Sequence, residues 1–264
     1  MKLKLVPARQ GIAWVKSGLR VFFMKPMAFC LLFLIFMVVG PSLVLAIAPL
    51  TTIAFMLATQ QALQGRFPMP SVYIQPLRAD RQRQWAQVKL GVAYAICTIL
   101  LWLISKSVEG GALDALHAAM SAGKSPEELA PLMSDPRLQA WWFVLVVGVG
   151  LLAVPFWYAP ALVHWGGMGA GKAVFFSTVA CWRNKGALMM YSLGWTAVMM
   201  VFAIISSTII ALLGSPQLAL AAIMPAALMI SAAFYASLFF TFVDCFEPAD
   251  AGDVRIESPS KNTP

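Results

Sequence analysis

The sequence predicts an all-α fold, a polytopic transmembrane helical bundle of about six spans, because long stretches of it carry no charge. Asp, Glu, Lys and Arg are all absent from 26–65, 90–105, 138–171 and 186–243. A spanning helix needs about 20 mostly apolar residues, so a bilayer accommodates stretches of this kind. The mean hydropathy of +0.78 and the charged fraction of 11% agree with a membrane protein.

The first uncharged block is long enough for two short spans. Gly40, Pro41 and Pro49 lie near its middle, where a turn would fall. We expect helices at about 27–44 and 48–63, since a proline in the first turn of the second helix costs little. The competing interpretation is one long, kinked helix.

Charge in the flanking segments decides between these interpretations. Residues 1–25 carry six Lys or Arg and no acid, and residues 64–89 carry five against one Asp. Cytoplasmic loops collect Lys and Arg, so both flanks are expected in the cytoplasm. The block between them must then cross an even number of times, which favours the hairpin.

The remaining spans follow from the other uncharged blocks. We expect them at about 88–105, 137–161, 187–212 and 218–243. Pro155 should bend the second of these four spans.

The connecting segments set the orientation. Acidic residues outnumber basic ones in 106–136, which predicts a periplasmic loop, and Ser125-Pro126-Glu127-Glu128 predicts a helix start within it. Both termini are then cytoplasmic. The tail 244–264 is acidic and rich in Pro and Ser, so we expect it to be disordered.

An amphipathic helix is predicted at about 8–25. Its apolar face comprises Ile12, Val15, Leu19 and Phe22, and its basic stripe comprises Arg9, Lys16 and Arg20. Such a helix either lies in the membrane interface or packs on the bundle as a cytoplasmic extension. Residues 11–29 also align with 171–189 without gaps, which suggests an internal repeat, although shared composition would give a similar match.

The sequence offers little for catalysis or metal binding. Gly166 to Lys172 resembles a phosphate-binding loop, but Ala173 stands where that motif has Ser or Thr. The four cysteines are isolated from one another, and the serines within the spans have no nearby base. We therefore expect no enzyme activity, no cofactor and no metal site.

The loop from Gln64 to Ile74 is the most specific-looking segment. Its prolines at 68 and 70 exclude a helix there. The residues that could bind lipid headgroups or a partner in and after it are Arg66, Phe67, Tyr73, Arg78, Arg81 and Arg83. A stiff linker between spans is the alternative. The net charge of +8 lies mostly near membrane boundaries and requires no nucleic acid.

Several short motifs together resemble a known family. They are Pro7-Ala8-Arg9 with Gly11 and Trp14, the stretch from Gly18 through Phe22 to Pro26, the Gln-Gly-Arg-Phe-Pro-Met-Pro loop at 64–70, Phe175-Phe176-Ser177, and Ala180 to Asn184. The chain resembles an uncharacterised family of multi-spanning inner-membrane proteins from beta-proteobacteria. The resemblance implies a helical bundle in the bacterial inner membrane and implies no activity.

Two functions follow as expectations. The leading one is a non-catalytic, membrane-structural or lipid- or partner-binding role, carried by the basic segments 8–25 and 64–89 and directed at anionic headgroups. The alternative is a small-molecule or lipid transporter, which would need a polar cavity lined by Ser, Thr and Tyr near the kinked helices. Neither the oligomeric state nor a protein partner can be predicted.

Overall fold

The computed structural model describes the backbone of residues 1–213 and 216–247, and its side chains except those of 39–47, 126, 213–220 and 222. The elements are β1 (Lys2–Leu3), α1 (Gln10–Met24), α2 (Pro26–Leu63), two short 3-10 turns (Pro70–Tyr73 and Gln75–Arg78), α3 (Arg81–Glu109), α4 (Ala112–Ser121), α5 (Pro126–Met133), α6 (Pro136–Phe156), α7 (Ala159–His164), α8 (Ala170–Arg183), α9 (Lys185–Leu213), α10 (Pro216–Cys245) and β2 (Phe246–Glu247). The predicted all-α class is confirmed.

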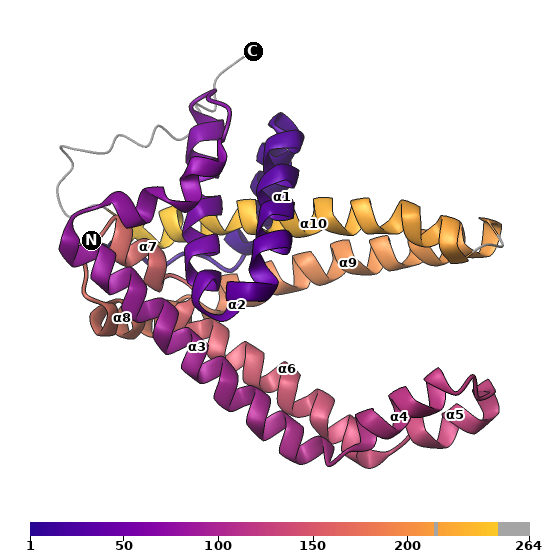
Figure 1. Cartoon of the computed structure of the whole chain (residues 1–264). Coiled ribbons are helices and arrows are strands. Elements are labelled where there is room, and N and C mark those ends of the chain that lie inside the picture. Colours follow the sequence, from indigo (N-terminus) through magenta and orange to yellow (C-terminus); the bar gives the residue numbers. More distant parts are fainter. Residues whose placement is uncertain (214–215, 248–264) are drawn as a thin grey trace.

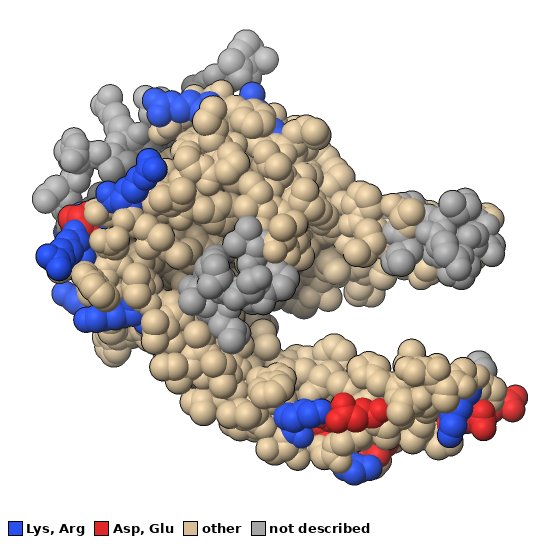
Figure 2. Space-filling model, in the orientation of Figure 1, with Lys and Arg blue, Asp and Glu red and all other residues tan. Residues whose placement is uncertain are grey.

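Two helical arms diverge from a common base (Figure 1). α3 and α6 lie side by side in one arm, which ends in α4 and α5, and α9 with α10 forms the other. At the base, α10 packs against α1 and α2. Figure 2 shows open space between the outer parts of the two arms.

The element α2 is not one straight helix. The rings of Phe29 and Phe55 stack with centroids 6.3 Å apart, and Phe33 also contacts Phe55 at 6.3 Å. A straight α-helix rises about 1.5 Å per residue and would hold Phe29 and Phe55 roughly 39 Å apart. The chain therefore reverses between Phe33 and Phe55, as the predicted hairpin requires and as a single long helix does not allow.

Four helices of the described chain are long and apolar enough to cross a membrane. They are Arg81–Glu109, Pro136–His164, Lys185–Leu212 and Ile223–Cys245. A fifth results if Gln10–Met24 and Pro26–Val38, which meet at 99°, count as one bent span. The chain is thus a multi-span membrane protein, while the count of six spans and their boundaries stay predictions.

Helix α1 packs onto the bundle against α9 and α10. Trp14, Val15 and Phe22 are buried, whereas Ile12 and Leu19 of the predicted apolar face are half-buried. The buried face is therefore turned slightly from the predicted one. Of the two interpretations of segment 8–25, packing on the bundle describes the observed contacts.

Two glycines let α1 approach its neighbours closely. A Cβ added at Gly11 would overlap the carbonyl oxygen of Ala187 at the start of α9, and one at Gly18 would overlap Ser237 of α10. The two glycines are seven residues apart, which is two helical turns, so they lie on one face of α1. Small residues at such crossings allow backbones to come into van der Waals contact, which drives helix association where lipid replaces water.

The suggested internal repeat has a counterpart in the element boundaries. α1 ends at Met24 and α2 begins at Pro26, while α8 ends at Arg183 and α9 begins at Lys185. Each pair therefore consists of a short helix, a one-residue break and a long helix. The two breaks are separated by nearly the same number of residues as the two aligned segments. The arrangement is consistent with a duplication.

The two ends of the described chain are joined at the base. β1 pairs antiparallel with β2, and Lys4 forms an ion pair with Glu247 at 3.0 Å, which raises the pKa of the lysine. The side chain of Asn184 also accepts a hydrogen bond from the amide of Val6 and donates one to the carbonyl of Lys4.

The start of the predicted disordered tail, at residue 244, was placed too early, because residues 244–247 belong to α10 and β2. The rest of that tail lies outside the described residues.

The predicted helix start in segment 106–136 is confirmed. The side chains of Ser125 and Glu128 form a capping box at the N-terminus of α5, in which the Ser125 amide donates to Glu128 at 3.0 Å. At the next helix start, Asp135 caps α6 and contacts Arg137 at 2.8 Å, and these hydrogen bonds lower the pKa of the Asp135 carboxyl. The segment is therefore an ordered helical tip rather than an irregular loop.

The glycine contacts of α1 can be tested by adding one methyl group. Gly11→Ala and Gly18→Ala should each destabilise the protein by about 1–3 kcal/mol, because the backbone neighbours cannot move aside cheaply. Thermal unfolding in detergent, followed by size-exclusion chromatography, measures the effect. Gly150→Ala is the matched control, since a Cβ at this helical position meets nothing within 4 Å. Equal stability of all three variants would contradict the packing described for α1.

Candidate functional site: a basic face and an aromatic cavity

The predicted basic residues gather at the end of the molecule opposite the tips of the arms. Figure 2 shows Lys and Arg along this end, while acidic and basic residues are mixed at the tip formed by α4 and α5. The exposed residues of the predicted set are Arg9, Lys16, Arg20, Arg66, Phe67, Arg78 and Arg81, and we call them the basic face. Within the described chain, none of these cations forms an ion pair, and the Phe67 side chain is 52% exposed.

Two residues of the predicted set have internal partners instead. Arg83 donates to the carbonyl of His164 at 2.9 Å and forms an ion pair with Asp80 at 3.0 Å, so it ties the start of α3 to the end of α7. The hydroxyl of Tyr73 donates to the carbonyl of Leu32 at 2.8 Å, and burial raises its pKa. Both residues hold the loop 64–80 against the bundle, so neither belongs to the exposed basic face.

Asp244 is also not the solvated end residue that its position suggests. One of its carboxylate oxygens accepts hydrogen bonds from the side chains of Gln10 and Trp14, each at 2.6 Å. These contacts fasten the end of α10 to the start of α1. They were not predictable from sequence, because the partners are more than 200 positions apart.

At the break between α6 and α7, a side chain of α8 replaces a missing backbone hydrogen bond. In a continuous helix the amide of Tyr158 would donate to the carbonyl of Val154. Here the Tyr158 amide donates to the hydroxyl of Ser177 at 3.0 Å, and that hydroxyl donates to the Val154 carbonyl at 3.0 Å. The hydroxyl of Ser177 is thus inserted into the hydrogen-bond ladder near Pro155, and it satisfies these two backbone groups.

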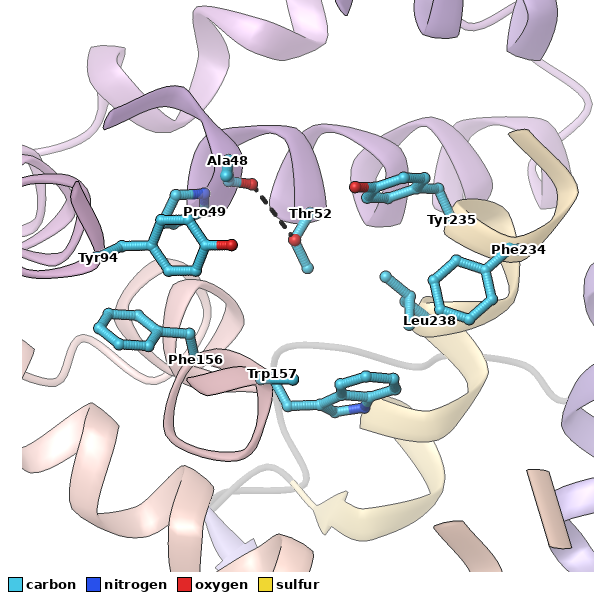
Figure 3. Close-up of a pocket in the computed structure, with 10 residues that line it drawn as sticks. Ala48, Pro49, Thr52, Tyr94, Phe156, Trp157, Phe234, Tyr235 and Leu238 are labelled. Atoms are coloured by element: carbon cyan, nitrogen blue, oxygen red, sulfur yellow. Dashed lines mark hydrogen bonds between the residues drawn. The ribbon is translucent and has the colours of Figure 1, made fainter. Parts of the chain in front are cut away.

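A small cavity of about 150 Å³ lies beside this break (Figure 3). Its lining residues are Ala48, Pro49, Thr52, Tyr94, Ala153, Phe156, Trp157, Phe234, Tyr235 and Leu238. In Figure 3 the hydroxyls of Tyr94 and Tyr235 point inward from opposite sides, toward the hydroxyl of Thr52. The Thr52 hydroxyl donates to the carbonyl of Ala48 at 3.4 Å. The two tyrosine hydroxyls have no hydrogen-bond partner among the described residues.

A larger, more apolar groove of about 700 Å³ adjoins the small cavity. The residues that line it are Phe33, Phe36, Met37, Trp157, Tyr191, Ser192, Trp195, Thr196, Met199, Ile230, Ser231, Phe234 and Tyr235. Trp157, Phe234 and Tyr235 belong to both linings, so the two spaces share a wall. We call the two spaces the small cavity and the aromatic groove.

Two tryptophans of these walls carry a buried N–H without an acceptor. The indole nitrogens of Trp157 and Trp195 are buried, and neither has a hydrogen-bond partner among the described residues. Leaving a buried donor unpaired costs about 1–3 kcal/mol. In Figure 3 the indole nitrogen of Trp157 lies on the side away from the small cavity, so the tyrosine hydroxyls are the donors that point into that space.

The described walls of the two spaces consist of aromatic, aliphatic and hydroxyl-bearing residues. Among the described residues, no Asp, Glu, Lys, Arg, His or Cys lines either space. In the part of the chain that the structure describes, no three His, Cys, Asp or Glu side chains gather where they could hold a metal ion.

Sequence reasoning found the neighbourhood of the cavity but not its residues. Pro155 marked an expected bend and Pro49 the start of a helix after a predicted turn, and the transporter hypothesis placed a Ser-, Thr- and Tyr-lined cavity near the kinked helices. Thr52, Tyr94 and Tyr235 carried no signal of their own, since an aromatic or hydroxyl residue in an apolar helix is common.

The chain is similar over nearly its whole length to a probable inner membrane protein of Burkholderia thailandensis. The two are 28% identical over 272 residues, which covers 98% of this chain and 99% of the other. No protein-family model matches the chain, and no solved structure matches it. The predicted resemblance to uncharacterised bacterial inner-membrane proteins is thereby confirmed.

The repaired break can be tested with two neighbouring residues. Ser177→Ala should destabilise the protein by about 1–3 kcal/mol, because it leaves the Tyr158 amide and the Val154 carbonyl without their shared partner. Thr178→Ala is the matched control, since its exposed hydroxyl bonds only to the carbonyl of Val174 in its own helix. Thermal unfolding of both variants in detergent is the measurement, and a Ser177→Ala variant as stable as the control would contradict the repair.

Proposed function

We propose that this chain is a non-catalytic protein of the bacterial inner membrane that binds anionic lipid headgroups through its basic face. The observation that carries the proposal is the grouping of exposed cations without acidic partners at one end of the described molecule. Juxtamembrane cations attract anionic lipids by about 1 kcal/mol each. Exposed Phe67 beside Arg66 adds an apolar side chain that can enter the headgroup region.

The proposal includes an orientation in which the basic face lies in the cytoplasm. With the basic face in the cytoplasm, the arms point toward the periplasm and the mixed-charge tip of α4 and α5 lies on the periplasmic side. β1 and β2, at the two ends of the described chain, pair at the base and would then lie on the cytoplasmic side. This arrangement follows the bias of Lys and Arg toward cytoplasmic segments.

Lipid binding can be tested by removing charge from the basic face. The triple variant Arg66→Gln, Arg78→Gln and Arg81→Gln should bind anionic lipid on the order of 100-fold more weakly, since three cations contribute about 3 kcal/mol. Titration of the detergent-solubilised protein with a short-chain phosphatidylglycerol, read by native mass spectrometry, measures this. Binding should also weaken with added salt, because exposed charges are screened.

Two matched variants complete this experiment. Lys124→Gln removes an exposed cation from the opposite end of the molecule and should leave lipid binding unchanged. Arg9→Gln, Lys16→Gln and Arg20→Gln together show whether α1 contributes as much as the loop. Unchanged phosphatidylglycerol binding in both triple variants would overturn the proposal.

A second candidate function is transport of a membrane-soluble small molecule. The observation that favours it is the small cavity beside Pro49 and the α6–α7 break, into which hydroxyls point. Broken helices that line a cavity near the middle of a membrane are a common feature of transporters. Uptake of a labelled solute into vesicles that contain the protein would be required to support it.

A further inference from the structure

The size of the small cavity limits what can enter it. At about 150 Å³ it matches the volume of an engineered protein cavity that binds benzene. A single six-membered ring therefore fits, whereas a lipid headgroup with phosphate and glycerol is too large. The rings of Phe156, Trp157 and Phe234 form much of the wall, and stacking between aromatic rings contributes stability beyond the burial of their surface. A flat ring is the shape that such walls favour.

The polar groups of the walls select the chemistry of that ring. The hydroxyls of Tyr94 and Tyr235 enter from opposite sides and lack partners among the described residues. The Thr52 hydroxyl already donates its proton to Ala48. A ligand with acceptor oxygens on opposite edges would accept a hydrogen bond from each tyrosine, so the two hydroxyls favour a ligand with acceptors over a purely apolar one.

Charge is excluded at the same place. Among the described residues, no ionisable side chain other than tyrosine lines the small cavity or the aromatic groove. An anion or cation there would lose its hydration without gaining a counter-charge, which costs several kcal/mol. The polar end of the ligand is therefore neutral.

The aromatic groove supplies room for an apolar chain. It shares Trp157, Phe234 and Tyr235 with the small cavity, so a molecule with its ring in the cavity can extend along it. Met37 and Met199, which line it, are about half exposed, at 47% and 50%, so the groove opens to the surface of the described molecule. The groove can thus be entered sideways from the bilayer.

We propose that the small cavity and the aromatic groove together bind a neutral amphiphile whose polar end is a six-membered ring with carbonyl-type acceptor oxygens and whose apolar tail lies in the groove. A membrane-soluble quinone has this chemistry. The inference names a ligand class for the second candidate function, yet it requires binding alone and is independent of lipid binding at the basic face.

The first test compares three ligands that differ in the polar end. 2-Decyl-1,4-benzoquinone should quench tryptophan emission of the detergent-solubilised protein saturably, because Trp157 and Trp195 line the site. A tenfold excess of decylbenzene, which lacks acceptors, or of 4-decylbenzenesulfonate, which carries charge, should not restore the emission. Absence of saturable quenching, or restoration by either competitor, would overturn the inference.

The second test removes the proposed donors without removing their rings. Tyr94→Phe and Tyr235→Phe should each weaken quinone binding about three- to tenfold, the loss expected for one hydrogen bond. Thr208→Val is the control, since Thr208 is exposed on α9, bonds to its own helix at Ile204 and lines neither space. Wild-type affinity in both tyrosine variants would overturn the assignment of the donors.

A third variant probes the volume of the site directly. Ala153→Phe places a ring in the small cavity and should abolish saturable quenching while the protein stays folded. The charge-neutralised Arg66, Arg78 and Arg81 variant should bind the quinone as wild type does. A failure of quinone binding and a failure of lipid binding are therefore seen separately, on different variants. Unchanged quenching by Ala153→Phe would contradict the location of the ring.

Discussion

The close contact of α10 with α1 and α2 is the interaction on which the base of the molecule depends. The contact face of α10 consists of small residues, with Ala232, Ala233, Ala236 and Ser237 all buried. Gly18 of α1 lies directly against Ser237, and the hydroxyl of Thr59 in α2 donates to the carbonyl of Ala236 at 3.0 Å. Between apolar helices surrounded by lipid, close packing and hydrogen bonds of this kind replace the hydrophobic effect as the source of association.

The same contact determines where the aromatic residues gather. With α1 and α2 held against one face of α10, Phe234 and Tyr235 project from the neighbouring positions toward α2, α6 and α9. Tyr235 meets Phe33, Phe36 and Phe55 at ring distances between 5.1 and 6.2 Å, and Phe234 meets Trp157, Tyr191 and Trp195 at 5.5 to 6.4 Å. Large rings cannot fill the angles between diverging helices completely. The small cavity and the aromatic groove are therefore consequences of a tightly packed base from which two arms spread.

Patterns local in the sequence predicted much of this architecture. The uncharged blocks gave the long helices, and the basic flanks of 26–65 indicated the reversal that the Phe29–Phe55 contact shows. The burial of α1 was predicted only in part. Periodicity finds the apolar face of the helix, but it does not show that Gly11 and Gly18 allow the closest approach to α9 and α10 and so lie on the buried face. Contacts between distant positions could not be predicted at all. Arg83 was assigned to a binding surface since its charge was visible in the sequence, while its acceptor, the His164 carbonyl, was not.

The break after Pro155 connects the packing of the bundle with the cavity. The break separates the Tyr158 amide from the Val154 carbonyl, and in an apolar medium these two backbone groups need other partners. Ser177 supplies them from α8, which allows α6 to end at Phe156 and the chain to turn at Trp157. That turn directs Phe156 and Trp157 into the wall opposite Thr52 and Tyr235. A hydroxyl outside the cavity therefore holds open the bend that shapes it, so the cavity is a built feature of the fold and not a gap left by loose packing.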